Sequence, residues 1–395
     1  MKVVFAHDSR FIKNSDGKIY SSGSLGNKVW NRYLNVFDEI AVVSRMENIE
    51  NSNLEIKNLN LSSNEKVSFY PIPNISSPKG LIFNKKLAEK LITKQIEKAD
   101  GLIARLPSEI GNLAIKVAKK IKKPYLVEVV ACPWDNLWNY GNIQGKVYAP
   151  YATYQMKKNV IDAPFSLYVT KENLQKKYPN NGRNIGCSDV EISMIEKSVI
   201  EKRVKNIKNG RNIMKIGLIG TLNNKIKGID VAIKAIDEVV KYTDVEFHIL
   251  GGGDNSQWVN YAKKFNLESK VFFDGKLPSG DPINNWLDDI DIYIQPSYQE
   301  GLPRALIEAM SRGCPCLASN VGGIPELLDE RYLHNPGDYN KLSKQILKLC
   351  NDKDAMELCS KQSFTTSKEY YSDNLNKKRN DFYQEFFEFI SMKAK

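Results

Sequence analysis

Residues 290–326 read IDIYIQPSYQEGLPRALIEAMSRGCPCLASNVGGIPE, and two kinds of pattern alternate in this stretch. An apolar run ends at residues 295–297 (QPS), which predicts a buried strand followed by a loop. Pro303 then opens a segment whose apolar residues have helical spacing, and that segment ends near Gly313. A second apolar run at residues 315–319 predicts another strand. A strand, a helix and a strand in succession predict a βαβ unit in a parallel sheet.

The same alternation continues on both sides of this stretch. Towards the N-terminus the further strands predicted are residues 2–6, 40–44, 67–72, 101–105, 125–130, 165–169, 214–220, 245–250 and 271–273. The fold class is therefore α/β, with two doubly wound, Rossmann-like parallel-sheet domains and a cleft between them. We expect an N-terminal domain at residues 1–195, a linker at 196–212 and a C-terminal domain at 213–373. An amphipathic segment, residues 374–395, predicts a terminal helix that returns to the N-terminal domain.

Composition narrows the class of protein. The chain has 395 residues, is 42% hydrophobic and carries a formal net charge of +11. No apolar run approaches the roughly 18–20 residues that span a bilayer, and the N-terminus has no signal-peptide pattern. We therefore expect a cytoplasmic protein that can sit at the inner face of the cell membrane. The positive charge is compatible with nucleic acid, an anionic membrane or phosphorylated substrates. No basic-aromatic nucleic-acid module is present.

The predicted helix that follows the first strand of the opening stretch has the chemistry of a ligand site. The first N–H groups of a helix lack internal partners and attract anions, so a diphosphate can lie there. Glu300 precedes the helix and Glu308 lies in its apolar face, where an ordinary charge fits poorly. Carboxylates accept hydrogen bonds from diols, so one suits a sugar and the other a ribose. The donor-site residues predicted here are Ser297, Glu300, Gly301, Leu302, Pro303 and Glu308.

This segment resembles the Glu-x7-Glu signature of GT-B retaining glycosyltransferases of glycosyltransferase family 4. Residues 320–326 (NVGGIPE) are similar to the Gly-Gly-x-Pro-Glu turn that follows it in that family. The resemblance covers residues 213–350, and the N-terminal half is similar only in layout. It looks closest to members that build bacterial surface polysaccharides. The resemblance implies that Glu300 positions the transferred sugar, that Glu308 holds the ribose, and that Lys227 stabilises the charge on the leaving phosphate. We expect Glu300, Lys227 and His7 to be the catalytic residues.

A second motif, residues 220–230 (GTLNNKIKGID), follows a predicted strand. The family commonly has Gly-Arg-Leu and then Lys-Gly here, and the Lys and the Arg contact the donor diphosphate. Lys227 matches the Lys, whereas Thr221 stands at the Arg position. Lys225 and Arg304 are the candidates for a replacement cation.

Three further glycine- or lysine-containing turns complete the predicted donor site. Small residues at 22–27 (SGSLGN) allow close approach of a phosphate to the backbone, and Gly26 is the candidate contact. Gly252 ends a predicted strand at the same sheet edge. Lys276 belongs to residues 273–277 (FDGKL), similar to the segment that borders the nucleotide base in the family.

The N-terminal domain is expected to hold the acceptor. Residues 125–135 (YLVEVVACPWD) form a strand and a loop, and they supply Glu128, Trp134 and Asp135 as candidate acceptor contacts. His7 ends the first predicted strand and is the candidate substrate contact there. We expect His248 in a core and His334 at the surface.

The predicted function is transfer of a sugar from a nucleotide-sugar to a glycan or lipid-linked glycan. A UDP-sugar is favoured and a GDP-sugar is the second candidate. We expect no metal and no cofactor, because no motif for a metal is present and the nucleotide-sugar is a co-substrate. Two alternatives stay open: a nucleotide-sugar epimerase of the same architecture, and a nucleotide-sugar-binding protein without turnover.

Overall fold

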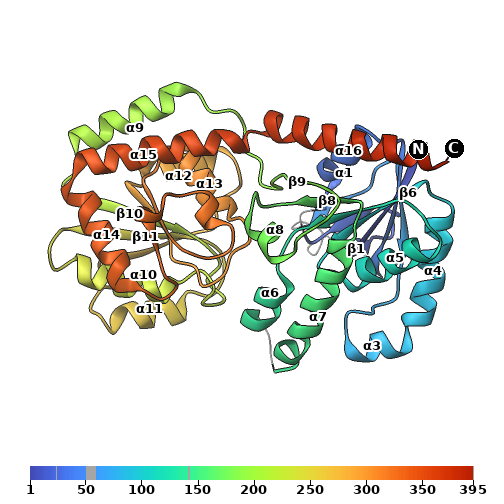
Figure 1. Cartoon of the computed structure of the whole chain (residues 1–395). Coiled ribbons are helices and arrows are strands. Elements are labelled where there is room, and N and C mark those ends of the chain that lie inside the picture. The colour runs from blue at the N-terminus through green and yellow to red at the C-terminus, as the bar shows by residue number, and fades with distance from the viewer. Residues whose placement is uncertain (24, 50–58, 141–142, 395) are drawn as a thin grey trace. The chain divides into compact units, whose positions relative to one another are not determined.

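The structure is a computed structural model that describes residues 1–23, 25–49, 59–140 and 143–394. The chain divides into two compact units (Figure 1). Unit 1 comprises Met1–Cys187 and Asn376–Lys395, and unit 2 comprises Ser188–Leu375. Among the described residues, no helix is both long enough and apolar enough to cross a bilayer.

The sheet of unit 1 is mainly parallel and doubly wound. Its parallel strands run in the order β5-β3-β1-β6-β7-β8-β9. β2 pairs antiparallel with β1, and β4 pairs antiparallel with β2. The strands are β1 (Lys2–Lys13), β2 (Ile19–Ser21), β3 (Glu39–Asn48), β4 (Asn60–Leu61), β5 (Val67–Pro71), β6 (Gly101–Leu106), β7 (Tyr125–Val129), β8 (Phe165–Tyr168) and β9 (Arg183–Gly186). β1 is longer than the predicted strand at 2–6, because its pairing with β3 shifts register after Ala6 and resumes at Arg10.

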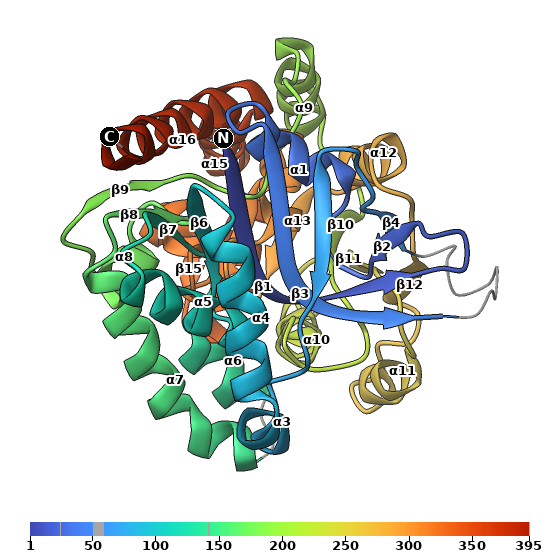
Figure 2. The ribbon, with the colours of Figure 1, turned by 90° about the vertical axis from the view of Figure 1, so that its right-hand side faces the viewer.

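Helices cover both faces of this sheet (Figure 2). The helices of unit 1 are α1 (Asn27–Leu34), α3 (Pro78–Phe83), α4 (Lys85–Glu97), α5 (Glu109–Lys120), α6 (Pro133–Tyr140), α7 (Ile143–Ile161) and α8 (Asn173–Lys177). On one face, Ala88, Ile92, Ala114 and Met156 bring α4, α5 and α7 into one buried core. On the other face, Trp30 of α1 packs edge-on against Phe5 of β1.

The terminal helix α16 (Ser372–Ala394) belongs to unit 1 from Asn376 onwards. Phe382 and Phe386 lie against Phe165 of β8, and Tyr383 stacks on Tyr33 of α1. Each such buried side chain contributes about 1.5–3 kcal/mol of stabilisation. Apolar burial of this size explains why the end of the chain folds with the first 187 residues.

The sheet of unit 2 is entirely parallel. Its order is β12-β11-β10-β13-β14-β15, the 3-2-1-4-5-6 order of a dinucleotide-binding fold. The strands are β10 (Met214–Ile219), β11 (Val245–Leu250), β12 (Val271–Gly275), β13 (Ile292–Gln295), β14 (Cys316–Ser319) and β15 (Leu333–His334). The chain direction across the sheet reverses between β10 and β13, which are neighbours. Ligands of such sheets bind at this switch point, beyond the carboxyl ends of the strands.

Two groups of helices pack on the sheet of unit 2. The helices and 3₁₀ turns are α9 (Lys197–Asn209), α10 (Ile229–Val239), α11 (Ser256–Lys263), α12 (Asp281–Asp289), α13 (Arg304–Ser311), η1 (Ile324–Glu326), η2 (Glu330–Tyr332), α14 (Tyr339–Asn351), α15 (Lys353–Ser367) and η3 (Lys368–Tyr370). Helix α10 contacts α11 and α14, while α15 contacts α9 and α13.

The predicted linker at residues 196–212 is mostly helix α9, and it lies within unit 2. Arg203 is 5% exposed, and its guanidinium donates hydrogen bonds to the carbonyl oxygens of Leu287 and Ile290. Burial of this arginine fixes the helix to the domain, so the linker assignment is wrong. The linker was predicted because the alternation of strands and helices weakens in this part of the sequence and Asn209-Gly210 is a turn signal.

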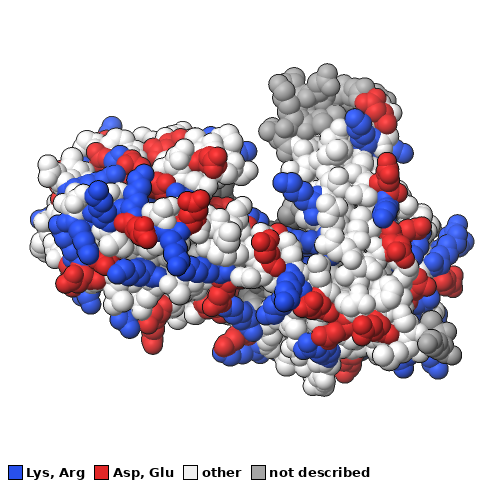
Figure 3. Space-filling view, turned by 90° about the horizontal axis from the view of Figure 1, so that it is seen from above, with Lys and Arg blue, Asp and Glu red and all other residues white. Residues whose placement is uncertain are grey.

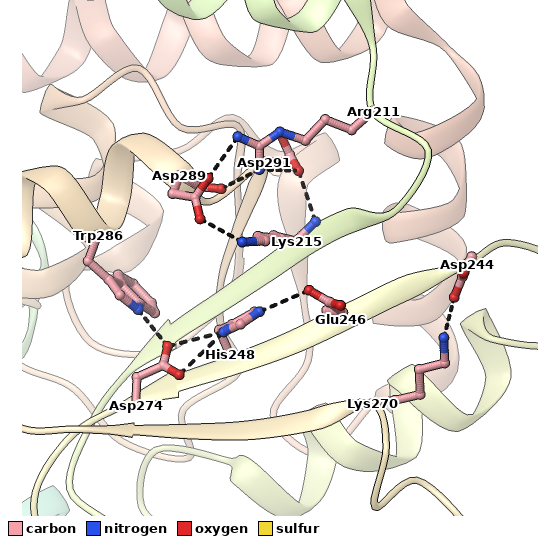
Figure 4. A network of polar contacts seen from close by, with 10 residues as sticks. All are labelled: Arg211, Lys215, Asp244, Glu246, His248, Lys270, Asp274, Trp286, Asp289 and Asp291. Carbon is pink, nitrogen blue, oxygen red and sulfur yellow. Dashed lines mark hydrogen bonds and ion pairs between the residues drawn. The ribbon is translucent and has the colours of Figure 1, made fainter.

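A polar network joins β10, β11, β12 and α12 in unit 2 (Figure 4). His248 lies between Asp274 and Glu246, with its Nδ1 3.1 Å from Asp274 Oδ2. The indole nitrogen of Trp286 donates to the same carboxylate at 2.6 Å. The hydrogen bond to Asp274 raises the pKa of His248 against the effect of burial. His248 is partly exposed and was wrongly expected in a core, while His334, expected at the surface, is 1% exposed.

Candidate active site

The loops that follow β10 and β13 lie together at the switch point of unit 2. The two strands pair through Ile216 and Ile292, so their carboxyl ends emerge side by side. Residues 220–228 follow β10, and residues 296–303 follow β13. The backbone N–H of Tyr298 donates to the carbonyl of Ile226 at 2.8 Å. The structure therefore brings the two strongest predicted motifs into contact.

Lys227 and Glu300 form an ion pair between these two loops. Lys227 Nζ lies 2.7 Å from Glu300 Oε1, and the two side chains are 25% and 8% exposed. The same oxygen accepts hydrogen bonds from Ser297 Oγ at 2.7 Å and from Gln295 Nε2 at 2.9 Å. Three donors on one oxygen hold the carboxylate in a single orientation.

Ser297 has a different place from the one predicted. Its side chain is fully buried, and its hydroxyl donates to Glu300 and accepts from Gln295. It therefore orients Glu300 and does not face a ligand. Gln295 completes this arrangement and was missed, because a buried glutamine at the end of a strand carries no recognisable motif.

Glycines let the backbones of this site approach closely. Gly228 has φ +69°, and a Cβ there would lie 1.9 Å from the carbonyl oxygen of Pro296. Gly322 has φ +55°, and a Cβ there would lie 2.0 Å from the carbonyl oxygen of Glu300. No side chain fits at either position. Gly228 packs the Lys227 loop on β13, and Gly322 packs the turn after β14 on Glu300.

Glu308 lies on α13, which begins directly after Pro303. Its side chain is largely buried, and no side chain within the described ranges donates a hydrogen bond to its carboxylate. Burial raises the pKa of Glu308, and the positive charge of Arg304 opposes this shift. A carboxylate that is desolvated and has no internal donor is ready to accept hydrogen bonds from a ligand.

The two cations predicted to replace an arginine at position 221, Lys225 and Arg304, are both exposed. Thr221 is partly exposed, and its hydroxyl accepts a hydrogen bond from the N–H of Asn223 at 3.3 Å. Lys225 is exposed in the same loop. Arg304, also exposed, donates from Nη1 to the carbonyl of Glu191 at 3.4 Å. Which of these two cations takes the place of an arginine at position 221 stays a prediction.

The neighbouring strand ends hold the other predicted donor contacts. Gly252 follows β11, and its carbonyl accepts from the N–H of Leu222 at 3.0 Å. Lys276 follows β12 and is exposed, and a Cβ built on Gly252 would lie 3.8 Å from its Cδ. Gly301 is exposed and Leu302 partly so, while Pro303 is the buried residue before α13.

The predicted residues of unit 1 have more varied surroundings. His7 is partly exposed, and burial together with Arg105 and Arg45 lowers its pKa to about 3, which makes the ring neutral. Its Nδ1 accepts from the N–H of Ser9 at 3.1 Å, so the proton of the neutral ring is on Nε2. Gly26 precedes α1, and a Cβ there would lie 3.2 Å from Asn60 Cβ. Ser24 of the same predicted loop lies outside the described residues.

Glu128 is an internal residue of unit 1. It is 1% exposed, and its carboxylate accepts from the hydroxyls of Tyr33 and Tyr383 and from Arg105 Nη1 at 2.8 Å. The expectation that it contacts an acceptor is wrong. A buried carboxylate with three donors joins α1, β6, β7 and α16 instead.

Trp134 and Asp135 lie in the first turn of α6 and remain accessible. Trp134 stacks on Trp138, with ring centroids 5.1 Å apart and planes at 9°. Asp135 pairs with Lys177 at 2.8 Å. Sequence reasoning missed Trp138, although its spacing of four residues from Trp134 on a helix indicates a shared face.

Comparison with known proteins decides the family. A family model described as "Glycosyl transferases group 1" matches residues 214–352. Over 348 residues the chain is 40% identical to Protein CapJ of Staphylococcus aureus, covering 88% of this chain and 85% of that protein. The chain belongs to the group 1 glycosyltransferases. It is therefore an enzyme, a glycosyltransferase of hexosyltransferase type.

Two further similarities concern this glycosyltransferase. It is 28% identical over 167 residues to the UDP-Gal:alpha-D-GlcNAc-diphosphoundecaprenol alpha-1,3-galactosyltransferase of Escherichia coli, covering 40% of this chain and 42% of that enzyme. Its fold matches that of HepE from Anabaena in complex with UDP, with a TM-score of 0.65 and 16% identity, over 98% of this chain and 100% of that one. The predicted GT-B fold is confirmed.

Proposed function

We propose that this glycosyltransferase is a retaining enzyme of the family 4 type. It takes a hexosyl group from a nucleotide-sugar and moves it to a glycan or lipid-linked glycan in the synthesis of a cell-surface polysaccharide. A UDP-sugar is the favoured donor and a GDP-sugar the second candidate. The observation that carries the proposal is the ion pair of Lys227 and Glu300 at the switch point, with the largely buried Glu308 on the adjoining helix.

The donor lies across the carboxyl ends of β10 and β13 in this proposal. Glu308 accepts hydrogen bonds from the two ribose hydroxyls, because no side chain in the described part of the chain donates to its carboxylate. Glu300 uses Oε2 for the hydroxyls of the sugar, since Oε1 already accepts from Lys227, Ser297 and Gln295. The nucleotide base of the donor lies towards Gly252 and Lys276, at the ends of β11 and β12.

Lys227 supplies the charge that the leaving group needs. Its ammonium group has three donors, so it can keep one on Glu300 while another reaches the diphosphate. The free N–H groups at the start of α13 add positive potential to the same place. These groups are fixed before the reaction and stabilise the negative charge that develops on the phosphate. The proposal therefore requires no metal ion and no cofactor.

Retention follows if the acceptor attacks from the face that the nucleotide leaves. The bond from the anomeric carbon to the diphosphate oxygen breaks, and a bond to the acceptor oxygen forms on the same face. The acceptor proton passes to the leaving phosphate. His7 donates a hydrogen bond to the substrate through its Nε2–H. Because the ring is neutral, His7 positions the substrate and does not act as an acid.

The acceptor class rests on similarity and on two exposed residues. The name of the similar E. coli enzyme states a UDP-linked galactose donor and a diphosphoundecaprenol-linked acceptor. By analogy, this supports a UDP-sugar donor and a lipid-linked glycan acceptor. Trp134 and Asp135 are the candidate acceptor contacts in unit 1. We place the enzyme in the cytoplasm, at the inner face of the cell membrane.

Turnover distinguishes this function from its two alternatives. UDP-, GDP- and ADP-sugars are screened by thermal shift, because a ligand of the folded state raises the melting temperature. Donors that bind are then incubated with and without glycan acceptors. The proposal predicts acceptor-dependent release of nucleoside diphosphate. Conversion of the donor in the absence of acceptor would instead identify an epimerase, and binding with no product would identify a non-catalytic protein.

A further inference from the structure

Large apolar side chains project from three helices at one end of unit 1. Ile82 and Phe83 of α3 and Ile143 and Val147 of α7 are 75–82% exposed. Trp134 and Trp138 are exposed on α6, the helix that directly precedes α7 in the chain. Soluble proteins expose single apolar residues commonly, but a group on neighbouring helices indicates an interaction site.

The same segments are strongly basic. Residues 78–90 and helix α7 together contain seven lysines and one acidic residue, Glu89. Glu89 pairs with Lys116 at 3.3 Å, so this acidic charge is already balanced. Lys79, Lys85, Lys86 and Lys146 are exposed, and Lys146 Nζ lies 5.6 Å from the ring centroid of Trp138.

These segments lie near one another within unit 1. Figures 1 and 2 both show α3 and the first turns of α7 at the same end of the unit. Leu81 and Lys85 line one side of a cavity of about 420 Å³ whose other side includes Tyr151 and Gln155 of α7. Helix α6 packs directly on α7. The three helices that carry the projecting residues therefore lie near one another in unit 1.

Another basic region of the molecule has a different character. Helices α9 and α15 of unit 2 lie on the face shown in Figure 3, where positive and negative side chains are interspersed. Lys208 and Lys361 both pair with Glu357, at 3.5 and 2.6 Å. Interspersed charges of both signs are typical of an ordinary solvated surface.

We propose that α3, α6 and the first half of α7 form a docking surface for the surface of an anionic lipid bilayer. We call it the α3–α7 surface and define it by Ile82, Phe83, Trp134, Trp138, Ile143 and Val147 with the lysines around them. The isoleucine, valine and phenylalanine side chains enter the boundary of the acyl chains, and the tryptophans lie at the depth of the headgroups. The lysines attract anionic headgroups. No helix needs to cross the bilayer for this mode of binding.

Charge complementarity selects the bilayer over a second copy of the chain. The surface carries an excess of positive charge, so two copies placed face to face would repel each other. An anionic bilayer supplies the opposite charge and an apolar layer at once. The binding free energy combines both terms, and the electrostatic part weakens as salt is added.

Vesicle co-sedimentation of the full chain tests the proposal. The probes are vesicles of phosphatidylglycerol mixed with phosphatidylcholine, and vesicles of phosphatidylcholine alone. The wild type is expected to bind the anionic vesicles, and salt should weaken this binding. The double variant Ile82→Asp/Phe83→Asp should bind them at least about tenfold more weakly, because two inserted side chains become charged. Lys85→Glu/Lys86→Glu should lose the preference for anionic lipid by a similar factor.

Matched controls come from unit 2. Met194 is 77% exposed, so Met194→Asp changes an equally exposed apolar residue elsewhere. Lys263→Glu/Lys264→Glu reverses two exposed lysines of α11 and its end. Both control variants should bind vesicles as the wild type does.

Three results would overturn the proposal. One is absence of vesicle binding by the wild type, and another is equal loss of binding in the control variants. The third is a dimer, seen by light scattering, that Ile82→Asp/Phe83→Asp separates while vesicle binding stays unchanged. Thermal shift with UDP-sugars should be unaltered in every variant, so the donor-site proposal stands or falls separately.

Discussion

Replacement of Glu308 by glutamine separates ligand binding from stability. The carboxylate is largely buried and accepts no side-chain hydrogen bond from the described residues, so the free protein holds a desolvated charge. A glutamine side chain keeps the shape and removes the charge. We therefore expect Glu308→Gln to leave the melting temperature of the free protein unchanged or higher, since a charged group no longer has to be buried.

The same substitution should weaken donor binding considerably. A hydrogen bond to a charged group is worth about 1.5–3 kcal/mol. Loss of one such bond to the ribose raises the dissociation constant about 10- to 150-fold. Isothermal titration with UDP measures the effect. Glu330→Gln, a change at an exposed glutamate in η2, is the matched control and should bind UDP normally.

The pH dependence adds an independent check. The pKa of Glu308 is raised, so its carboxylate is protonated at a higher pH than an ordinary glutamate. UDP affinity of the wild type should fall as the pH is lowered through this pKa, and the fall should be absent in Glu308→Gln. Unchanged UDP affinity in the variant, or a lower melting temperature with normal affinity, would refute the reasoning and assign Glu308 a structural role.

Three other predictions concern the framework of the two units. Gly228→Ala should destabilise unit 2 by at least about 2 kcal/mol and abolish UDP binding, because φ is +69° and the new Cβ would collide with Pro296. The control Gly280→Ala, at φ +95° with open space around it, should bind UDP normally. Glu128→Gln should lower stability by about 3–5 kcal/mol in urea unfolding with unchanged UDP affinity, whereas Glu385→Gln, in the exposed pair with Arg183, should cost less than about 1 kcal/mol. The pKa of His248 is raised by Asp274, so its stabilising contribution is complete below the unfolded value of 6.5 and is lost as the pH rises through the folded pKa. The stability difference between wild type and His248→Gln should therefore shrink from mildly acidic to alkaline pH, and a difference independent of pH would contradict this.

The architecture could be predicted because periodicity and turn residues act locally. The strand, loop and helix around Pro303 and the turn after Gly220 are visible in the sequence, and parallel strand order then brings their ends together. The pairing of Lys227 with Glu300 follows from this order. The hydrogen bonds that hold Glu300 in place cannot be predicted in this way, since Ser297 and Gln295 come to lie beside Glu300 only in the folded chain.

The errors arose where tertiary packing decides the environment of a polar residue. Arg203 and Glu128 are charged, yet both are buried. Backbone carbonyls accept hydrogen bonds from Arg203, and tyrosine hydroxyls donate to Glu128. His334 looked like a surface residue because the short strand β15 that buries it has only two residues. Propensity and spacing describe the chain locally, so they cannot supply partners that lie many residues away.

The most direct measurement is a crystal structure of the chain soaked with UDP. The account predicts the ribose hydroxyls on Glu308, and the diphosphate within hydrogen-bonding distance of Lys227 Nζ and the first N–H groups of α13. UDP bound elsewhere on unit 2, with the Lys227 and Glu308 side chains making no contact to it, would contradict the central claim.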